Sequence, residues 1–228
     1  MRTSTFRLAA CTALALAALL AWDLSGLDLA LAGLSGTAQG FPLRDAPLLA
    51  QVLHGDAKTA AWLLVLLLCA AAIWPPHLLR NLPQGRRVQL AASALVATGA
   101  VTLLKTLSHT SCPWDLAQFG GVARHVSHWS GWLVQDGGAG HCFPAGHAST
   151  GFAFIGGFFA LRHDQPRLAW VWLLIALVAG LGFGWVQQLR GAHFMSHTLW
   201  TGWICWILAW ASDPLFARAT DTPVQEAA

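Results

Sequence analysis

The sequence predicts an all-α protein, an integral membrane bundle of six transmembrane helices. Of its 228 residues, 56% are hydrophobic and only 10% are charged, and the mean hydropathy is +0.54. A soluble domain typically has about 25% charged residues, so this chain cannot cover its surface with charge. Six stretches approach or reach the roughly 17 to 25 apolar residues that a helix needs to cross a bilayer. They cover residues 6–22, 59–74, 88–104, 147–161, 168–186 and 192–211.

The first of these stretches, 6–22, follows Arg2 and Arg7, which is also the pattern of a secretory signal peptide. No small-residue cleavage site comes after it, so we expect a retained helix. The later stretches contain clusters of alanine and glycine, which let membrane helices approach closely. We therefore expect one packed domain over residues 1–228 that ends in a polar cytoplasmic tail over 212–228.

Basic residues indicate how such a bundle is oriented. Six crossings divide the 13 Lys and Arg residues into eight on one side and five on the other. The positive-inside tendency places the larger group, and with it both termini, in the cytoplasm. Eight of the ten histidines fall on or near the opposite side, so we expect the functional site at the periplasmic or exterior face of a cytoplasmic (inner) membrane. A net charge of +3 without a basic run gives no reason to expect a nucleic-acid partner. The outer group of basic residues is Arg44, Lys58, Lys105, Arg124 and Arg190.

Three short strings of polar residues lie at the outer mouths of the predicted spans. In the first, six residues separate Lys105 from the pair 112–113, Cys-Pro. The second is Cys-Phe-Pro-Ala-Gly-His over 142–147, and the third is Arg-Gly-Ala-His over 190–193. A helical bundle can bring three such mouths together, so the strings are candidates for one site.

In this order and at these positions, the strings resemble the signature of the type-2 phosphatidic acid phosphatase (PAP2) superfamily, which includes the vanadium haloperoxidases. That signature reads Lys-x6-Arg-Pro, Pro-Ser-Gly-His and Ser-Arg-x5-His-x3-Asp, and the resemblance covers residues 105–197. It implies a helical bundle with a phosphate pocket at its outer face, and a phosphatase that needs no metal or other cofactor. Among the departures from the signature, Cys112 replaces arginine, Ala145 replaces serine, Gln187 replaces arginine and His197 replaces aspartate.

The residues present suit the chemistry of a phosphate ester. The transition state carries charge on three equatorial oxygens, so without a metal it needs fixed cations and oriented N–H donors. Lys105 can supply one cation and Arg190, one helical turn from Gln187, the other. Gly146 stands where the predicted helix opens and can offer backbone N–H groups to a phosphate. Ala145 belongs to the same substrate-binding string but lacks the hydroxyl of serine.

The resemblance assigns nucleophilic attack and proton transfer to two histidines. His193 would attack phosphorus to form a phosphohistidine, and His147 would protonate the departing oxygen and then activate water. An attacking imidazole needs a partner that fixes its other nitrogen. His197, four residues further along the predicted helix, can accept that hydrogen bond without adding charge. Asp115, or alternatively Asp136, could provide a carboxylate.

Two of the five cysteines lie in the outer strings. In an oxidising compartment, a disulfide between Cys112 and Cys142 would close a loop of about thirty residues and tie the first string to the second. Such a bridge is worth about 3–4 kcal/mol in the chain-entropy account. It would also explain the missing arginine, because position 112 would serve structure.

The predicted function is hydrolysis of a lipid phosphate at the outer leaflet, with the lipid tail left in the bilayer. Phosphatidate, phosphatidylglycerol phosphate, a polyprenyl diphosphate and lipid A phosphate all fit. One alternative is a lipid phosphotransferase that uses the same site. A different class is a metal-binding or transport protein, because His193 and His197 have H-x3-H spacing and His147 or His141 could add a ligand. The nearly uncharged spans argue against transport.

Overall fold

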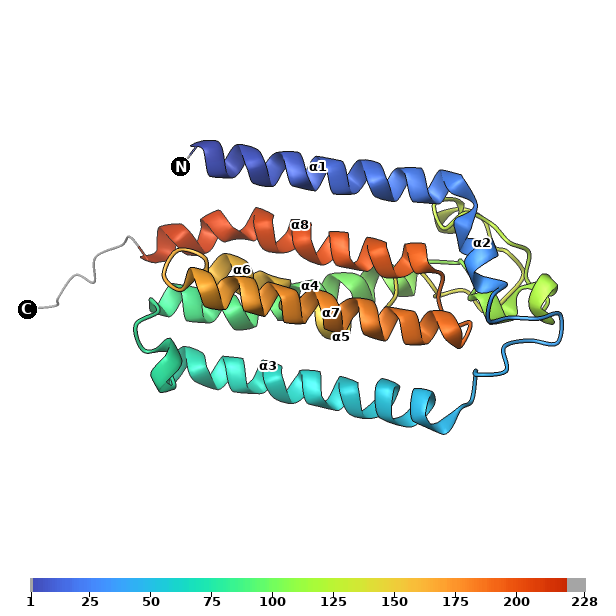
Figure 1. The fold of residues 1–228 in the computed structure, drawn as a ribbon, viewed down its shortest axis with the longest axis horizontal. Helices are drawn as coiled ribbons and strands as arrows, with labels where there is room; N and C mark the ends of the chain where they lie inside the picture. The colour runs from blue at the N-terminus through green and yellow to red at the C-terminus, as the bar shows by residue number, and fades with distance from the viewer. Residues whose placement is uncertain (1, 221–228) are drawn as a thin grey trace, which may run out of the picture.

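The computed structural model describes residues 2–220, which form helices, turns and loops with no β-strand. Five long helices lie side by side, and a shorter helical segment lies among them (Figure 1). Every stretch predicted as a span falls on a helix. The long helices are α1 (Arg2–Ser25), α3 (Ala57–Ile73), α4 (Gln84–Leu107), α7 (Pro166–Leu189) and α8 (Met195–Thr220), and the shorter segment joins α5 (Ser149–Phe152), η6 (Ala153–Ile155) and α6 (Gly156–Leu161).

The shorter helical segment forms the centre of the core. Ile155, Phe159 and Leu161 are each at most 1% exposed, and they pack with side chains from α3, α4, α7 and α8. Close helix contacts depend on glycine here. A Cβ added at Gly151 would collide with the backbone of Gly180 on α7. The small-residue clusters therefore act as predicted, because they allow backbones to touch.

Three helical segments are long and apolar enough to cross a membrane, namely Thr5–Ser25, Gln84–Leu107 and Pro166–Leu189. Two shorter apolar segments, Ala57–Ile73 and Ser149–Leu161, accompany them. Large apolar side chains on α3 and α7 also point outward, and Leu66, Leu67, Leu174 and Ile175 are all more than 60% exposed. Such a surface is unfavourable in water and suits lipid. These apolar helices indicate a membrane protein, and within residues 2–220 three of the six expected spans meet this criterion.

Most helix boundaries lie a few residues from the predicted ones, and three of the differences concern the site or the tail. The helix expected from 147 begins at Ser149, and the one expected from 192 begins at Met195. The same helix, α8, continues to Thr220, so residues 212–220 are helical and not a tail; the rest of the predicted tail, 221–228, lies outside the described residues. A buried ion cluster explains the extension. Asp213 accepts hydrogen bonds from Arg86 and Arg162, both at 2.6 Å, and this anchors the helix beyond its apolar part.

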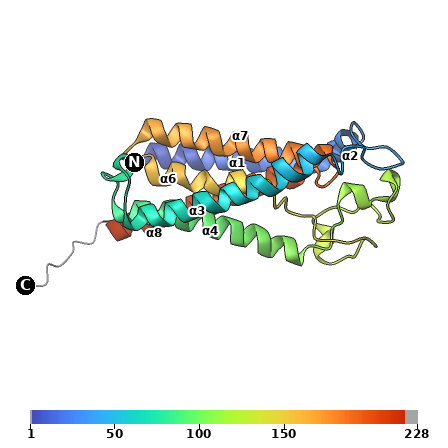
Figure 2. The ribbon, with the colours of Figure 1, turned by 90° about the horizontal axis from the view of Figure 1, so that it is seen from below.

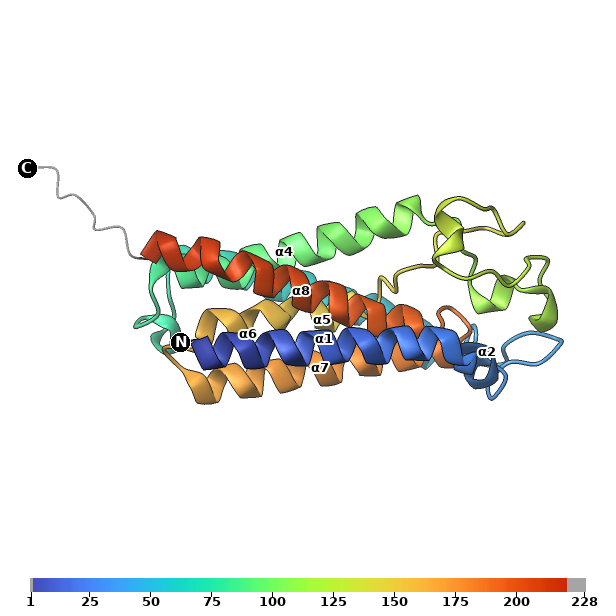
Figure 3. The same cartoon turned by 90° about the horizontal axis from the view of Figure 1, so that it is seen from above.

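The long connections gather at one end of the bundle, which we call the loop end. It contains residues 108–148, the α7–α8 connection at 190–194 and the short helix α2 (Leu27–Ala32) (Figures 1 and 2). The start of α1 and the end of α8 lie at the opposite end (Figure 3). Short turns complete the helical elements, with η3 (Pro113–Asp115), η4 (Ala117–Phe119) and η5 (Ser130–Trp132) at the loop end, η2 (His77–Leu79) at the other end, and the π-helix η1 (Leu48–Asp56) leading into α3.

Candidate active site

The two histidines predicted to share a site do meet at the loop end. His193 lies in the connection between α7 and α8, and His147 lies in the turn before α5. Their ring centroids are 6.2 Å apart and the ring planes are tilted by 46°. His193 is only 2% exposed. The separation leaves both imidazoles within reach of one phosphoryl group.

A tight turn after α7 directs His193 inward. Gly191 has a φ of 73°, in the left-handed region that favours glycine at the end of a helix. The next residue, Ala192, donates its N–H to the carbonyl of Gln187 at 2.8 Å. A Cβ at Gly191 would also collide with the ring of Phe41. The sequence Arg-Gly-Ala-His therefore ends one helix and places its histidine inside the bundle.

The turn that carries His147 is tied to α8. Thr201 donates its hydroxyl to the carbonyl of Ala145 at 3.2 Å, and the N–H of Ala145 donates to the carbonyl of His197 at 3.3 Å. Ser149 donates its hydroxyl to the carbonyl of Gly146 at 2.6 Å. Because its N–H is already used, Ala145 shapes this turn and is not a backbone donor for phosphate.

Lys105, near the end of α4, lines a cavity of about 410 Å³ together with Gly146 and His147. A Cβ on Gly146 would lie 3.6 Å from the Lys105 Nζ, so this glycine stands directly beside the ammonium group. Lys58, from the first turn of α3, lines the same cavity. Lys58 is one of the outer basic residues, and its place on the same side as Lys105 was the signal in the sequence that could have assigned it to the site.

Arg190 is held firmly at the loop end. Its Nε donates to the carbonyl of Arg44 at 2.8 Å, and its Nη1 donates to the Oε1 of Gln187 at 3.3 Å. The side chain is buried, and Arg44 in turn lies over the ring of Trp114 at 4.4 Å. Arg190 and Gln187 are thus neighbours, as their spacing of one helical turn predicts. Gln187 occupies the position of the arginine in the family signature, and it orients Arg190.

The surroundings of His193 keep its imidazole neutral. His193 lies in a loop, outside the apolar helices. Burial lowers its pKa well below the ordinary value, and the charges of Lys105, His197 and His147 lower it further, while the backbone of Cys142 raises it. A neutral imidazole has a free lone pair, which is the form that can attack phosphorus.

The two aspartates proposed as partners of the nucleophile serve other groups. The Oδ2 of Asp115 accepts hydrogen bonds from the backbone N–H of Cys112 at 3.3 Å and from the indole of Trp114 at 3.1 Å. It therefore caps the turn η3. Asp136 accepts the backbone N–H and the hydroxyl of Ser111, at 2.6 and 2.7 Å. The prediction that one of these carboxylates orients the nucleophile is wrong, because both are engaged within the loop.

His197 also differs from its predicted role. Its ring meets that of His193 edge to face, with centroids 5.9 Å apart, and is packed in the same way against Phe143, Phe194 and His128. The expected hydrogen bond from His193 is not formed. The Nδ1 of His197 is buried without a hydrogen-bond partner among the described residues. His197 therefore acts as a packing neighbour of His193.

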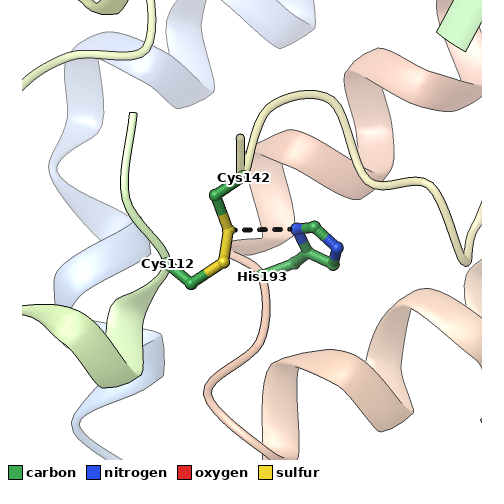
Figure 4. A group of neighbouring side chains, drawn as sticks. All are labelled: Cys112, Cys142 and His193. Atoms are coloured by element: carbon green, nitrogen blue, oxygen red, sulfur yellow. Dashed lines mark hydrogen bonds between the residues drawn. A yellow bond between two sulfur atoms is a disulfide. The ribbon is translucent and has the colours of Figure 1, made fainter. Parts of the chain in front are cut away.

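The predicted disulfide is present. Cys112 and Cys142 are bonded, with Cα atoms 5.2 Å apart, and the bridge joins η3 to the string that carries His147. Figure 4 shows the ring of His193 beside this bridge, with the Cys142 Sγ 3.4 Å from Nδ1. The same sulfur lies 3.0 Å from the carbonyl oxygen of Ala192.

Within residues 2–220, one group of side chains has ligand atoms close enough together to hold a metal ion. The sulfur atoms of Cys112 and Cys142 and a ring nitrogen of His193 lie within 4.8 Å of one another. A bonded pair of sulfurs offers no thiolate, which is the form that binds metals. The alternative set of His193, His197 and a third histidine does not form such a group.

The comparisons with known proteins agree with the strings that meet in this site. The profile of the PAP2 superfamily matches residues 87–220, which include most of α4, residues 108–148 and 190–194 of the loop end, α7 and α8. No curated protein and no solved structure matches the chain. The matched region covers more than half of the sequence and contains His147, His193 and Lys105. Membership indicates phosphatase or phosphotransferase activity on phosphate esters, and the chain belongs to the PAP2 superfamily.

Proposed function

We propose that this protein is a membrane phosphatase that hydrolyses a lipid or isoprenoid phosphate through a phosphohistidine, without a metal cofactor. The observation that carries the proposal is the meeting of His147 and His193, 6.2 Å apart, beside the cavity that Lys105 lines. Two imidazoles and a cation are what a two-step phosphoryl transfer requires. Their place at the end of an apolar bundle favours a substrate anchored in lipid.

The proposed reaction has two balanced steps. In the first, a ring nitrogen of His193 forms a bond to phosphorus while the bond from phosphorus to the lipid oxygen breaks, and His147 gives its proton to that oxygen. In the second, His147 takes a proton from water as the water oxygen attacks phosphorus, and the nitrogen–phosphorus bond breaks to release phosphate. Lys105 and Arg190 stabilise the charge on the phosphoryl oxygens in both steps.

The shape of the cavity supports a lipid substrate. Its polar end has Lys58, Lys105 and His147, and its walls between α3, α4 and η6 are largely apolar. A headgroup phosphate can then reach the histidines while the tail lies along the helices. The apolar part of the lining is formed by Ala61, Trp62, Val65, Ala153 and Phe154. A larger cavity of about 530 Å³, between α1 and α8, contains none of the proposed site residues.

The topology proposed with this function has six crossings, both termini in the cytoplasm and the loop end at the outer face of the membrane. The chain acts as one unit, because the site draws residues from α3, α4, the α5 turn and the α7–α8 connection. The disulfide suits an oxidising exterior. This orientation puts the phosphate site at the outer leaflet.

Phosphate release from a panel of purified lipid phosphates tests the proposal. We expect release from at least one member of the panel, unchanged activity in EDTA, and inhibition by vanadate, which adopts the pentacoordinate geometry of the transition state. A soluble sugar phosphate presented at the same concentration is the control, and we expect it to be a poor substrate. Loss of activity in EDTA would contradict metal independence and favour the metal-binding alternative. Transfer of labelled phosphate to a second lipid, with none to water, would identify a phosphotransferase.

The two lysines of the cavity provide a graded prediction. Lys105→Ala should lower kcat by about 10²-fold and raise KM, because a cation beside the phosphoryl group acts most strongly as charge develops. Lys58 is exposed at the mouth of the cavity, so Lys58→Ala should raise KM and leave kcat within about threefold of wild type, as expected for binding that is uniform between ground and transition states. Steady-state kinetics on lipid in mixed micelles measures both. A larger kcat loss for Lys58→Ala than for Lys105→Ala would reverse the assignment.

A further inference from the structure

The nucleophile has a neighbour that neither the sequence nor the family signature assigns. Asp115 and Asp136 are engaged elsewhere, and His197 meets His193 only edge to face. The group that stands next to the Nδ1 of His193 is the Sγ of Cys142, at 3.4 Å. This distance is suitable for an N–H···S hydrogen bond.

The chemistry of the sulfur fixes the direction of this hydrogen bond. The sulfur belongs to the Cys112–Cys142 disulfide, so it carries no proton and can only accept. The imidazole must then donate from Nδ1. A neutral imidazole has one N–H, so a proton on Nδ1 leaves the lone pair on Nε2. Figure 4 shows that second nitrogen on the side of the ring away from the disulfide.

Burial strengthens the hydrogen bond between the Nδ1 of His193 and the sulfur of Cys142. Cys142 is fully buried and His193 is 2% exposed, so bulk water does not compete for the Nδ1 proton. A buried N–H without an acceptor would cost free energy, and a proton on Nδ1 has the sulfur as an acceptor. The carbonyl oxygen of Ala192 lies 3.0 Å from the sulfur. It has no proton to donate, so it does not compete with His193 as a hydrogen-bond donor to the sulfur.

We propose that the disulfide sulfur of Cys142 is the positioning group of the nucleophile and holds His193 with Nδ1 protonated and Nε2 ready to attack phosphorus. The role of the sulfur in catalysis rests on the proposed function, whereas the tautomer of His193 does not depend on it. The sulfur takes the place that a carboxylate would otherwise fill, and it orients the ring without adding a negative charge. The bridge is therefore more than a covalent brace between two strings.

A set of variants that all lack the bridge separates positioning from bracing. Cys112→Ala keeps the sulfur at position 142, Cys112→Ala with Cys142→Ala removes it, and Cys112→Ala with Cys142→Ser replaces it with an oxygen acceptor. We expect the double alanine variant to have a kcat about tenfold below that of Cys112→Ala with little change in KM, as the loss of one modest hydrogen bond predicts. The serine variant should recover most of the difference. EDTA is included throughout, because a free thiol beside His193 could bind zinc.

A spectroscopic measurement on the unmodified protein tests the tautomer without any substrate. In protein labelled with ¹⁵N-histidine, the His193 signals are identified by their loss in His193→Gln. We expect a protonated Nδ1 and an unprotonated Nε2 in the oxidised wild type, and a shift towards protonated Nε2 in the double alanine variant. Equal kcat values across the three bridgeless variants, or a protonated Nε2 in the wild type, would overturn the proposal. If the wild type hydrolyses no lipid phosphate, the proposed function fails, and the ¹⁵N spectrum alone then decides the placement of the proton.

Discussion

Replacing His193 with alanine should abolish phosphate release, with a loss of at least about 10³-fold in kcat, because the variant lacks the atom that forms the covalent bond to phosphorus. No neighbour can take over, since the adjacent imidazole of His197 is packed edge to face against aromatic rings. The loss should appear in kcat, with lipid binding retained. Phosphate release under saturating lipid measures it.

The matched control for this variant is His109→Ala, which removes an exposed histidine from the same loop end. We expect wild-type kinetics for it. Both proteins should retain the Cys112–Cys142 bridge and elute as the wild type does from size exclusion in detergent, which shows that the fold is intact. Rates near those of the wild type for His193→Ala would contradict the assignment of His193 as the nucleophile.

His147→Asn should show an effect that depends on the leaving group. For a lipid alkyl phosphate, the loss of the general acid should lower kcat by about 10²- to 10⁴-fold. An aryl phosphate such as p-nitrophenyl phosphate needs no protonation of its leaving group, so its first step should be much less affected. The second step lacks its base with either substrate, so we expect a rapid burst of p-nitrophenolate followed by slow turnover. Stopped-flow absorbance resolves the two phases.

The outcome for His147→Asn distinguishes a proton donor from a structural residue. A structural role would slow both substrates to the same extent and would give no burst. The geometry supports the specific outcome, because His147 lines the substrate cavity while its ring stands 6.2 Å from that of His193. Equal losses with the alkyl and aryl substrates would contradict the assignment.

The sequence was sufficient for the helices, and its resemblance to the PAP2 signature predicted the pairing of His147 with His193. Apolar stretches of span length have few alternatives to helix, and glycine clusters such as Gly151 against Gly180 show where helices touch. The disulfide was also predictable, because two cysteines stood in strings that had to converge. These features depend on composition and spacing, which a single sequence displays.

The partners of the nucleophile could not be predicted in the same way. Asp115 follows Pro113 in a short turn, and its carboxylate accepts a hydrogen bond from the local backbone and makes none to the nucleophile. His197 has the right spacing for a hydrogen bond, but the rings of Phe143 and Phe194 fix its orientation. Side-chain direction depends on packing around each residue, and spacing along the chain does not encode it.

The extension of α8 to Thr220 was not predicted from the sequence, for a related reason. Ser212, Asp213 and Pro214 resemble the start of a tail in the sequence, yet Asp213 lies in a buried cluster with Arg86 and Arg162. Those arginines lie 127 and 51 residues away along the chain. A tertiary ion cluster thus overrides the local signal.

Trapping of the phosphohistidine is the decisive experiment for the proposed nucleophile. His147→Asn is mixed with p-nitrophenyl phosphate labelled with ³²P in its phosphate and quenched in alkali, in which a phosphorus–nitrogen bond is stable. We predict label on the protein in the burst phase, stable to alkali and lost in acid, and located by mass spectrometry on His193. Full release of phosphate in a single turnover with no label on the protein, or label on another residue, would contradict the account.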